Sequence, residues 1–418
     1  MPPKPSPPRG CLTSAPPRLA RAFDHDPERP LSRRPLALSV AGVLLGTAPV
    51  AAPAQARPAA APVAIDQPAV NQPAVAAAVR AYARAHGFSG TVLVARRGRV
   101  LLREGFGLAD RAFGVPAAPD TRYWVASVTK LFTAVLVLQL VDAGRLDVEA
   151  PIRRYLPDYA GGGADRVTLA QLLHHTSGLA QWERATSYAD AVAHGLEAYQ
   201  LPHPPAELLA KYASDPLAHA PGTTFEYNNA DYVVLGAILE RVTGLPYDTL
   251  LARRLTTPLG LTGTGLLHAQ AVVPRLAPTY SRADSAAPLQ RDLPVYPENW
   301  WAAGGLYSTA DDLRAFADAL YGGRLLRPAT LRVLLTPGLD EYGCGLWVTA
   351  QDVDGTKHRF AQRPGRIMGA NVTLLRYLDD DLTVVVLGNT NAADVDAFGF
   401  VVGRTVLGGT GPSRATGR

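Results

Sequence analysis

Residues 127–142 read Ser127-Val128-Thr129-Lys130 followed by the apolar run LFTAVLVLQLVD. The run has the length of a helix and ends just before Gly144, so it predicts a buried helix that begins near Ser127. Residues three apart share one face of a helix, which brings the Ser127 hydroxyl and the Lys130 amine together. A neutral lysine can take the proton of a serine and make it a nucleophile. The positive end of the helix dipole would also stabilise the negative charge that develops on the oxygen of an attacked carbonyl.

The lysine in this stretch is unusual for the chain, which otherwise uses arginine. After residue 56, lysine occurs only at Lys130, Lys211 and Lys357. With the nine serines of that part, a chance Ser-x-x-Lys match is expected about 0.07 times. The alternative is an ordinary helix with a serine at its start and a solvated lysine. The apolar residues that follow argue against that alternative.

A second polar stretch, Phe225-Glu226-Tyr227-Asn228-Asn229, precedes another helical pattern. The Tyr227 hydroxyl could pass protons between a nucleophile and a leaving group, and Asn229 offers an amide to a substrate carbonyl. The alternative for such a stretch is a plain turn before a helix.

The rest of the chain alternates between strand and helix patterns. Helices are expected over 74–86, 169–174, 231–242, 311–321 and from 393, and strands over 90–95, 100–102, 345–349, 372–377 and 382–387. Strands near both ends with helices between them predict one α/β (α+β) body. In it the two ends share a sheet and the mainly helical middle is inserted.

Five stretches together resemble one family. They are Ser127-Val128-Thr129-Lys130, LLHHTSGL (172–179), YNN (227–229), GGLYST (304–309) and YGCGLW (342–347). Over about residues 75–408 the chain resembles the penicillin-recognising serine hydrolases of the class C β-lactamase and D-alanyl-D-alanine carboxypeptidase type, which include esterases. The resemblance implies an antiparallel sheet flanked by helices. It also implies Ser127 as the acylated nucleophile, Lys130 as its base partner, Tyr227 as the second proton carrier and Asn229 as a substrate contact.

The third motif of that family departs from the pattern. The family has Lys/His-Thr/Ser-Gly on a strand beside the cleft, and its spacing puts Arg363-Pro364-Gly365 there. Arg363 keeps the positive charge, whereas Pro364 lacks both the hydroxyl and the backbone N–H. By resemblance the oxyanion hole uses the N–H groups of Ser127 and Arg366, which need no particular side chain. We therefore expect weaker recognition of substrate carboxylates and a modest preference for ester or atypical amide substrates. The alternative is that 363–365 form a plain turn and the motif is lost.

The N-terminus has the pattern of an export signal. Arg33 and Arg34 precede an apolar run over 36–50, and Ala54-Gln55-Ala56 offers a cleavage site. The predicted organisation is an export leader (1–56), an Ala/Pro-rich linker (57–73), the hydrolase domain (74–410) and a tail (411–418). The protein is thus expected to be secreted or extracytoplasmic. Residues 32–36, SRRPL, fit the twin-arginine route, with an ordinary secretory signal as the alternative. A retained anchor is the alternative to cleavage.

Composition and charge exclude several classes. The chain has 418 residues, 47% of them hydrophobic, which is too apolar for a disordered protein. Residues 1–56 carry seven basic and three acidic groups, and the remainder carries 34 and 33, so no nucleic-acid partner is expected. With only Cys11 and Cys344, the mature chain has no intramolecular disulfide.

The remaining candidates have structural explanations. His174 and His175 lack an HxxxH companion, so no metal and no cofactor is expected. Trp300, Trp301 and Cys344 are expected in the core. The hypothesis is a monomeric serine hydrolase that forms an acyl-enzyme with a small-molecule, peptide or ester substrate, as a carboxypeptidase, a β-lactamase or an esterase. The alternative is a non-catalytic or slow-turnover penicillin-binding or sensor protein of the same fold.

Overall fold

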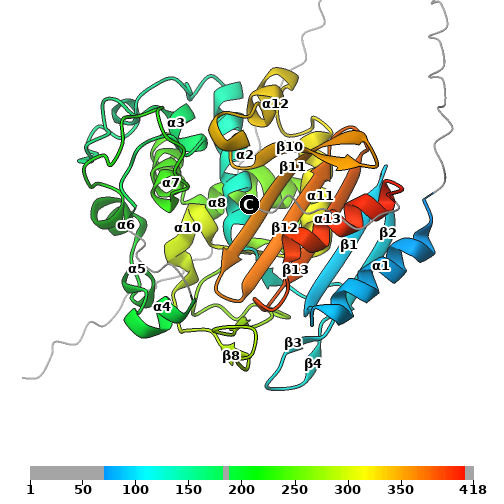
Figure 1. Ribbon diagram of the computed structural model, residues 1–418. Coiled ribbons are helices and arrows are strands. Elements are labelled where there is room, and N and C mark those ends of the chain that lie inside the picture. Colours follow the sequence, from blue (N-terminus) through cyan, green and yellow to red (C-terminus); the bar gives the residue numbers. More distant parts are fainter. Residues whose placement is uncertain (1–69, 182–187, 410–418) are drawn as a thin grey trace, which may run out of the picture. The chain divides into compact units, whose positions relative to one another are not determined.

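The computed structural model describes residues 70–181 and 188–409. Their central element is a six-stranded antiparallel sheet of order β10-β11-β12-β13-β1-β2 (Figure 1). The strands are β1 (Gly90–Arg96), β2 (Arg99–Phe106), β10 (Trp347–Val353), β11 (Thr356–Ile367), β12 (Ala370–Tyr377) and β13 (Leu382–Gly388). Val92 of β1 lies opposite Val386 of β13. The expectation that the two ends of the domain share a sheet is confirmed.

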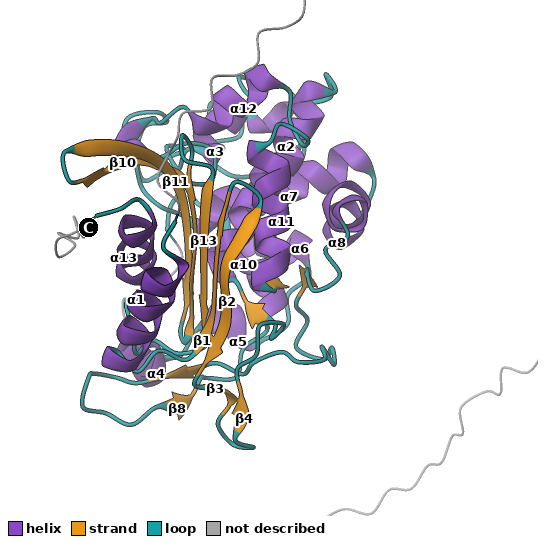
Figure 2. Ribbon diagram, turned by 90° about the vertical axis from the view of Figure 1, so that its right-hand side faces the viewer, coloured by secondary structure: helices purple, strands orange, loops and turns teal. Residues whose placement is uncertain are grey.

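Helices cover both faces of this sheet. Helices α1 (Gln72–Ala85) and α13 (Val395–Val406) lie on one face, and α2 (Thr129–Asp142), α7 (Asn229–Thr243) and α11 (Ala310–Tyr321) lie on the other side (Figure 2). Strands β12 and β13 are therefore buried along their whole length. This explains why β13 reads as the continuous apolar run LTVVVLG, since neither face of the strand meets water.

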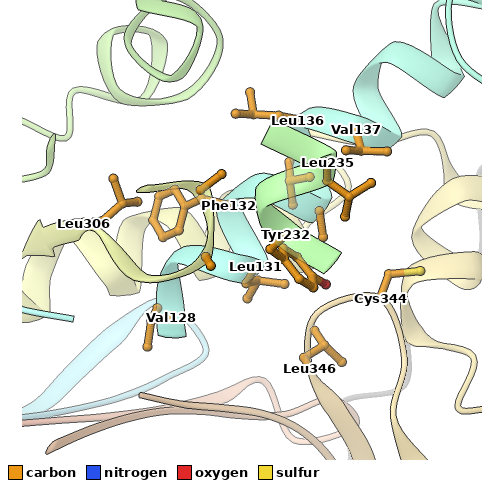
Figure 3. Close-up of a cluster of buried hydrophobic side chains, with 14 of the residues drawn as sticks. Val128, Leu131, Phe132, Leu136, Val137, Tyr232, Leu235, Leu306, Cys344 and Leu346 are labelled. Atoms are coloured by element: carbon orange, nitrogen blue, oxygen red, sulfur yellow. The ribbon is translucent and has the colours of Figure 1, made fainter. Parts of the chain in front are cut away.

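Helix α2 is the centre of the larger core. Its residues from Thr129 to Leu138 are all buried, as expected for a helix that is apolar on every side. The Phe132 ring stacks on Phe316 of α11, with ring centroids 3.8 Å apart. Figure 3 shows α2 side chains such as Leu131 meeting Tyr232 of α7. Lys130 is thus carried into the interior by the helix that holds the core together.

The middle of the chain is mainly helical, as predicted. Its other helices are α3 (Leu169–Leu173), α4 (Tyr188–His194), α5 (Glu197–Gln200), α6 (Pro205–Tyr212), α8 (Tyr247–Leu251), α9 (Thr257–Leu259), α10 (Trp301–Gly304) and α12 (Pro328–Leu335). Single turns are η1 (Ala126–Val128), η2 (Ile152–Arg154), η4 (Pro297–Trp300) and η5 (Leu339–Glu341), with a π-helical turn η3 (Ala252–Thr256). The short strands are β3 (Leu108–Asp110), β4 (Val115–Pro116), β5 (Tyr123–Trp124), β6 (Gly265–Leu266), β7 (Tyr280–Ser281), β8 (Gln290–Arg291) and β9 (Leu306–Ser308). Helices α3 and α11 begin at the expected caps, Thr168 and Thr309.

The structure differs from the sequence expectation in several places. The local patterns predicted neither strand β11, where only the resemblance placed 363–365 on a strand, nor helix α12, and β10 begins at Trp347 rather than near residue 345. Strand β11 was missed because its second half alternates cationic residues with proline and glycine. Helix α1 begins at Gln72, two residues before the expected start of the domain. The predicted leader, most of the linker and the tail lie outside the described residues. Within 70–181 and 188–409, no helix is long and apolar enough to cross a membrane.

Strand β11 has an open edge that matters for the site. Its pairing with β10 runs from Thr356 to Gln362, whereas its pairing with β12 continues to Ile367. Residues 363–367 therefore have a strand neighbour on one side only. A proline is tolerated there because an edge position does not need its N–H for a ladder. Residues 363–365 thus form a strand at a sheet edge, and the alternative of a plain turn there is wrong.

Candidate active site

Ser127 lies in the turn η1, where β5 ends and α2 begins. The preceding residue, Ala126, has a φ of +46°, a conformation that residues with side chains rarely adopt. The Thr129 hydroxyl, 2.6 Å from the Ala126 carbonyl to which it donates, accepts the N–H of Leu306 at 3.0 Å. These bonds tie the strained turn to β9 and fix the backbone around Ser127.

Lys130 is fully buried and makes three hydrogen bonds through its amine. Nζ lies 3.2 Å from Ser127 Oγ, 2.5 Å from Asn229 Oδ1 and 2.8 Å from the carbonyl oxygen of Ala303. An ammonium has three donors, and these acceptors surround it together with Tyr227. When the amine is neutral, two N–H groups can stay on Asn229 and Ala303 while the lone pair faces Ser127. The geometry therefore lets Lys130 take the Ser127 proton without moving.

Tyr227 stands beside the same amine. The Lys130 Nζ lies 4.8 Å from the centre of the Tyr227 ring, and Arg363 Nη2 donates to Tyr227 Oη at 2.5 Å. Burial by itself would raise the pKa of Tyr227. The positive charges of Arg363 and Lys130, with hydrogen bonds involving Lys130 and Ser127, outweigh it and lower that pKa. Tyr227 is thus a hydroxyl that gives up its proton more readily than an ordinary tyrosine.

Arg363 lies on strand β11, as the resemblance implied, and is 1% exposed. Its Nη1 donates to Tyr342 Oη at 2.7 Å and to the carbonyl oxygen of Gly345 at 3.3 Å. The guanidinium carbon lies 5.4 Å from the centre of the Tyr227 ring and 5.5 Å from that of Trp347. Burial would lower the pKa of Arg363, but the tyrosines raise it. The sequence analysis named Tyr342 and Trp347 only as parts of a motif and assigned neither a role.

Gly365 brings strand β11 against the nucleophile. A Cβ at this position would lie 2.4 Å from the Val125 carbonyl oxygen and 3.1 Å from the Ser127 nitrogen, so only glycine fits. The Arg366 side chain forms an ion pair with Asp396 of α13. The role of the Arg366 backbone N–H in an oxyanion hole stays a prediction.

Asn228 and Asn229 have different tasks at the start of α7. The Asn228 side chain caps the helix by accepting the N–H of Ala230 at 2.9 Å, whereas Asn229 Oδ1 holds Lys130. The contact of Asn229 with a substrate stays a prediction. The structure thus gathers Ser127, Lys130, Tyr227, Asn229, Arg363 and Gly365 in one place, together with the backbone of Arg366.

Sequence reasoning missed a buried polar group behind Tyr227. His175 Nδ1 lies 2.7 Å from Asp231 Oδ2 and accepts the N–H of Asn228 at 3.3 Å, while Ser177 Oγ donates to Asp231 Oδ1. Burial raises the pKa of Asp231 well above its usual value and lowers the pKa of His175. Both shifts favour the uncharged forms of Asp231 and His175. The His175 ring lies 4.4 Å from the Tyr227 ring.

The other candidates have structural roles, as expected. Trp300 and Trp301 are buried, and Trp300 stacks on Tyr199. His174 Nδ1 bonds to the carbonyl of Ala170. Burial raises the pKa of the Cys344 thiol to about 12, which keeps it an inert core residue. In the part of the chain that the structure describes, no group of histidine, cysteine and acidic side chains could hold a metal ion.

Comparison with known proteins decides the family. The family model described as beta-lactamase matches residues 75–399. The chain belongs to the β-lactamase family. Esterase EstB of Burkholderia gladioli is 35% identical over 268 residues, which cover 57% of this chain and 67% of EstB, about two thirds of its length.

Two solved structures extend the comparison of this β-lactamase-family chain. A penicillin-binding protein from Bacillus halodurans superposes with a TM-score of 0.67 at 25% identity, over 79% of this chain and 99% of that one. A D-stereospecific amidohydrolase from Streptomyces gives a TM-score of 0.66 at 27% identity, over 82% and 100%. The expected fold, antiparallel sheet with flanking helices, is confirmed. The protein is a serine hydrolase of a family that acts on small-molecule substrates.

Proposed function

We propose that this serine hydrolase cleaves acyl donors outside the cytoplasm through an acyl-enzyme on Ser127. The observation that carries the proposal is the geometry of Lys130. Its amine is buried, lies 3.2 Å from Ser127 Oγ and is held on its other sides by Asn229 and Ala303. A lysine in this position has the reach and the hydrogen-bond pattern of a general base.

The proposed reaction has two halves. Lys130 accepts the Ser127 proton as Oγ attacks the carbonyl, and the N–H groups of Ser127 and Arg366 stabilise the resulting oxyanion. Tyr227 passes a proton to the leaving group as the carbonyl–leaving group bond breaks, and Lys130 returns the proton that Tyr227 gives up. A water molecule then attacks the acyl carbonyl, loses its proton to the same groups and releases the acid, which restores Ser127.

Export and a monomeric state are further parts of this proposal. Export is supported by the arginine pair, the apolar run and the small-residue site before residue 57. Sequencing the N-terminus of the protein recovered from outside the cytoplasm tests it, and a mature chain that begins near residue 57 is expected. Light scattering coupled to size-exclusion chromatography tests the monomer.

The acyl-enzyme is tested by intact-mass spectrometry after treatment with a fluorophosphonate, a penicillin and an activated ester. A mass increase that maps to Ser127 and disappears in Ser127→Ala supports the proposal. The lifetime of each adduct separates turnover from slow release, and thus an enzyme from a penicillin-binding sensor. Unlabelled Ser127 with all three reagents would contradict the proposal.

A further inference from the structure

The guanidinium of Arg363 is enclosed by the protein on all sides. It has five N–H donors, of which two go to Tyr342 Oη and the Gly345 carbonyl and one goes to Tyr227 Oη. The side chain is 1% exposed, so its remaining N–H groups face protein atoms. The Tyr227 and Trp347 rings stack on each other with centroids 6.0 Å apart, and the guanidinium carbon lies 5.4 and 5.5 Å from those centroids. The guanidinium therefore offers no accessible surface to a substrate group.

We propose that Arg363, held in place by Tyr342 and the Gly345 carbonyl, is a fixed counter-charge for Tyr227 and not a receptor for a substrate carboxylate. The substrates of this hydrolase are then acyl donors whose leaving group carries no carboxylate, such as neutral esters and amides. The inference rests on the proposed acyl-enzyme at Ser127 and adds the substrate class to it. It also makes Tyr342 a positioning residue that sets specificity.

The charge balance of the site favours neutral leaving groups for a second reason. Arg363 already shares its charge with Tyr227, whose pKa is lowered despite burial. A carboxylate placed beside Tyr227 would compete for the same cation and would be repelled whenever Tyr227 loses its proton. A neutral leaving group needs only the proton that Tyr227 delivers.

The position of Pro364 distinguishes this inference from the explanation drawn from the sequence. Gln362 Nε2 donates to Asp396 Oδ1 at 2.8 Å, and Arg366 also contacts Asp396. Side chains alternate along a strand, so Pro364 shares the α13 face with these two residues, while Arg363 and Gly365 face Ser127. The enclosed cation, rather than the missing hydroxyl at 364, is then the cause of the selectivity.

The test uses a matched pair of thioesters with the same acyl group. In one the thiol leaving group carries a free carboxylate, and in the other that carboxylate is a methyl ester. We expect kcat/KM for the methyl ester to be at least about tenfold higher, because a carboxylate brought into the site without a cation to pair with loses its hydrogen bonds to water. The shorter side chain of Arg363→Lys cannot reach all three acceptors, so its charge is no longer enclosed in the same way. The ratio of kcat/KM for the methyl ester to kcat/KM for the free carboxylate is therefore expected to fall. Tyr342→Phe, which removes one acceptor of Arg363, should lower the ratio less. Pro364→Thr should leave it unchanged.

The outcomes separate the inference from the proposed function. Equal rates for the pair, or a preference for the free carboxylate, in an enzyme that a fluorophosphonate labels at Ser127 would overturn the inference alone. A ratio that falls in Pro364→Thr but not in Arg363→Lys would also overturn it, because the hydroxyl would then be the determinant. Absence of any acylation of Ser127 would overturn the proposed function and this inference together. The thermal midpoint of each variant shows that the compared proteins are folded, and Tyr342→Phe supplies the comparison if Arg363→Lys does not fold.

Discussion

Replacing Lys130 by methionine removes the amine while nearly preserving the length of the side chain. In the proposed reaction Lys130 takes the Ser127 proton across 3.2 Å. General-base catalysis contributes roughly 10²- to 10⁴-fold. Lys130→Met is therefore expected to slow acylation of Ser127 by at least about a hundredfold, which corresponds to a rise of about 2.7 kcal/mol in the activation barrier.

The same substitution has opposing effects on stability. Asn229 Oδ1 and the Ala303 carbonyl lose their donor, and each unsatisfied buried acceptor costs about 1–3 kcal/mol. The fold no longer has to bury the amine, whose charged form costs several kcal/mol to desolvate. These terms are of similar size, so the free energy of unfolding should change by only a few kcal/mol. The chemistry is lost and the fold is kept.

The assay is stopped-flow acylation by an activated neutral ester, with the thermal midpoint measured on the same samples. Lys357→Met is the matched control, because Lys357 is an exposed lysine at the start of β11. That variant should keep the wild-type acylation rate. A Lys130→Met enzyme that is folded and retains more than about a tenth of the rate would refute the assignment. Tyr227 would then be the leading base.

Three further predictions follow from the same contacts. Ser127→Ala should abolish covalent labelling and change the free energy of unfolding by about 1 kcal/mol, because Oγ loses one hydrogen bond to Lys130; labelling that persists in mass spectra would contradict this. Asp231→Asn should be tolerated and Asp231→Ala should cost about 2 kcal/mol or more in chemical denaturation, since alanine leaves Ser177 Oγ without its acceptor. The raised pKa of Asp231 makes wild type lose stability relative to Asp231→Asn as the pH rises above the unfolded value of about 4. Arg363→Gln removes a positive neighbour of Tyr227, so the limb of the acylation–pH profile that Tyr227 produces should move to higher pH; an unmoved limb would show that Arg363 does not set that pKa.

Local patterns in the sequence were sufficient to predict the main architecture. Helix α2 and the strands β1, β12 and β13 are long apolar segments, and such segments are buried wherever the fold places them. The Ser127–Lys130 pair lies within one helical turn, so its 3.2 Å contact follows from helix geometry alone. Features fixed by neighbours in the chain were therefore predictable.

Features fixed by distant contacts were not. Strand β11 mixes cationic residues with Pro364 and Gly365, and it exists because β10 and β12 pair with it. The Tyr342–Arg363 bond joins residues 21 positions apart on different elements. One available signal was Asp231, an acidic residue inside the apolar stretch 230–239, because an acid on a buried helix needs a partner.

The contacts that the sequence analysis missed and those that it predicted surround the two proposed proton carriers, Lys130 and Tyr227. The local pair sets the base, because Lys130 reaches Ser127 through its own helix. The distant contacts set the acid, because Tyr227 lies between the fixed cation of Arg363 and the ring of His175, which Asp231 holds. A guanidinium keeps its charge at any pH at which the fold survives, whereas a lysine or histidine at the same position could lose it. The arginine in the third motif therefore gives Tyr227 a constant electrostatic environment, at the cost of the exposed cation that would bind a substrate carboxylate.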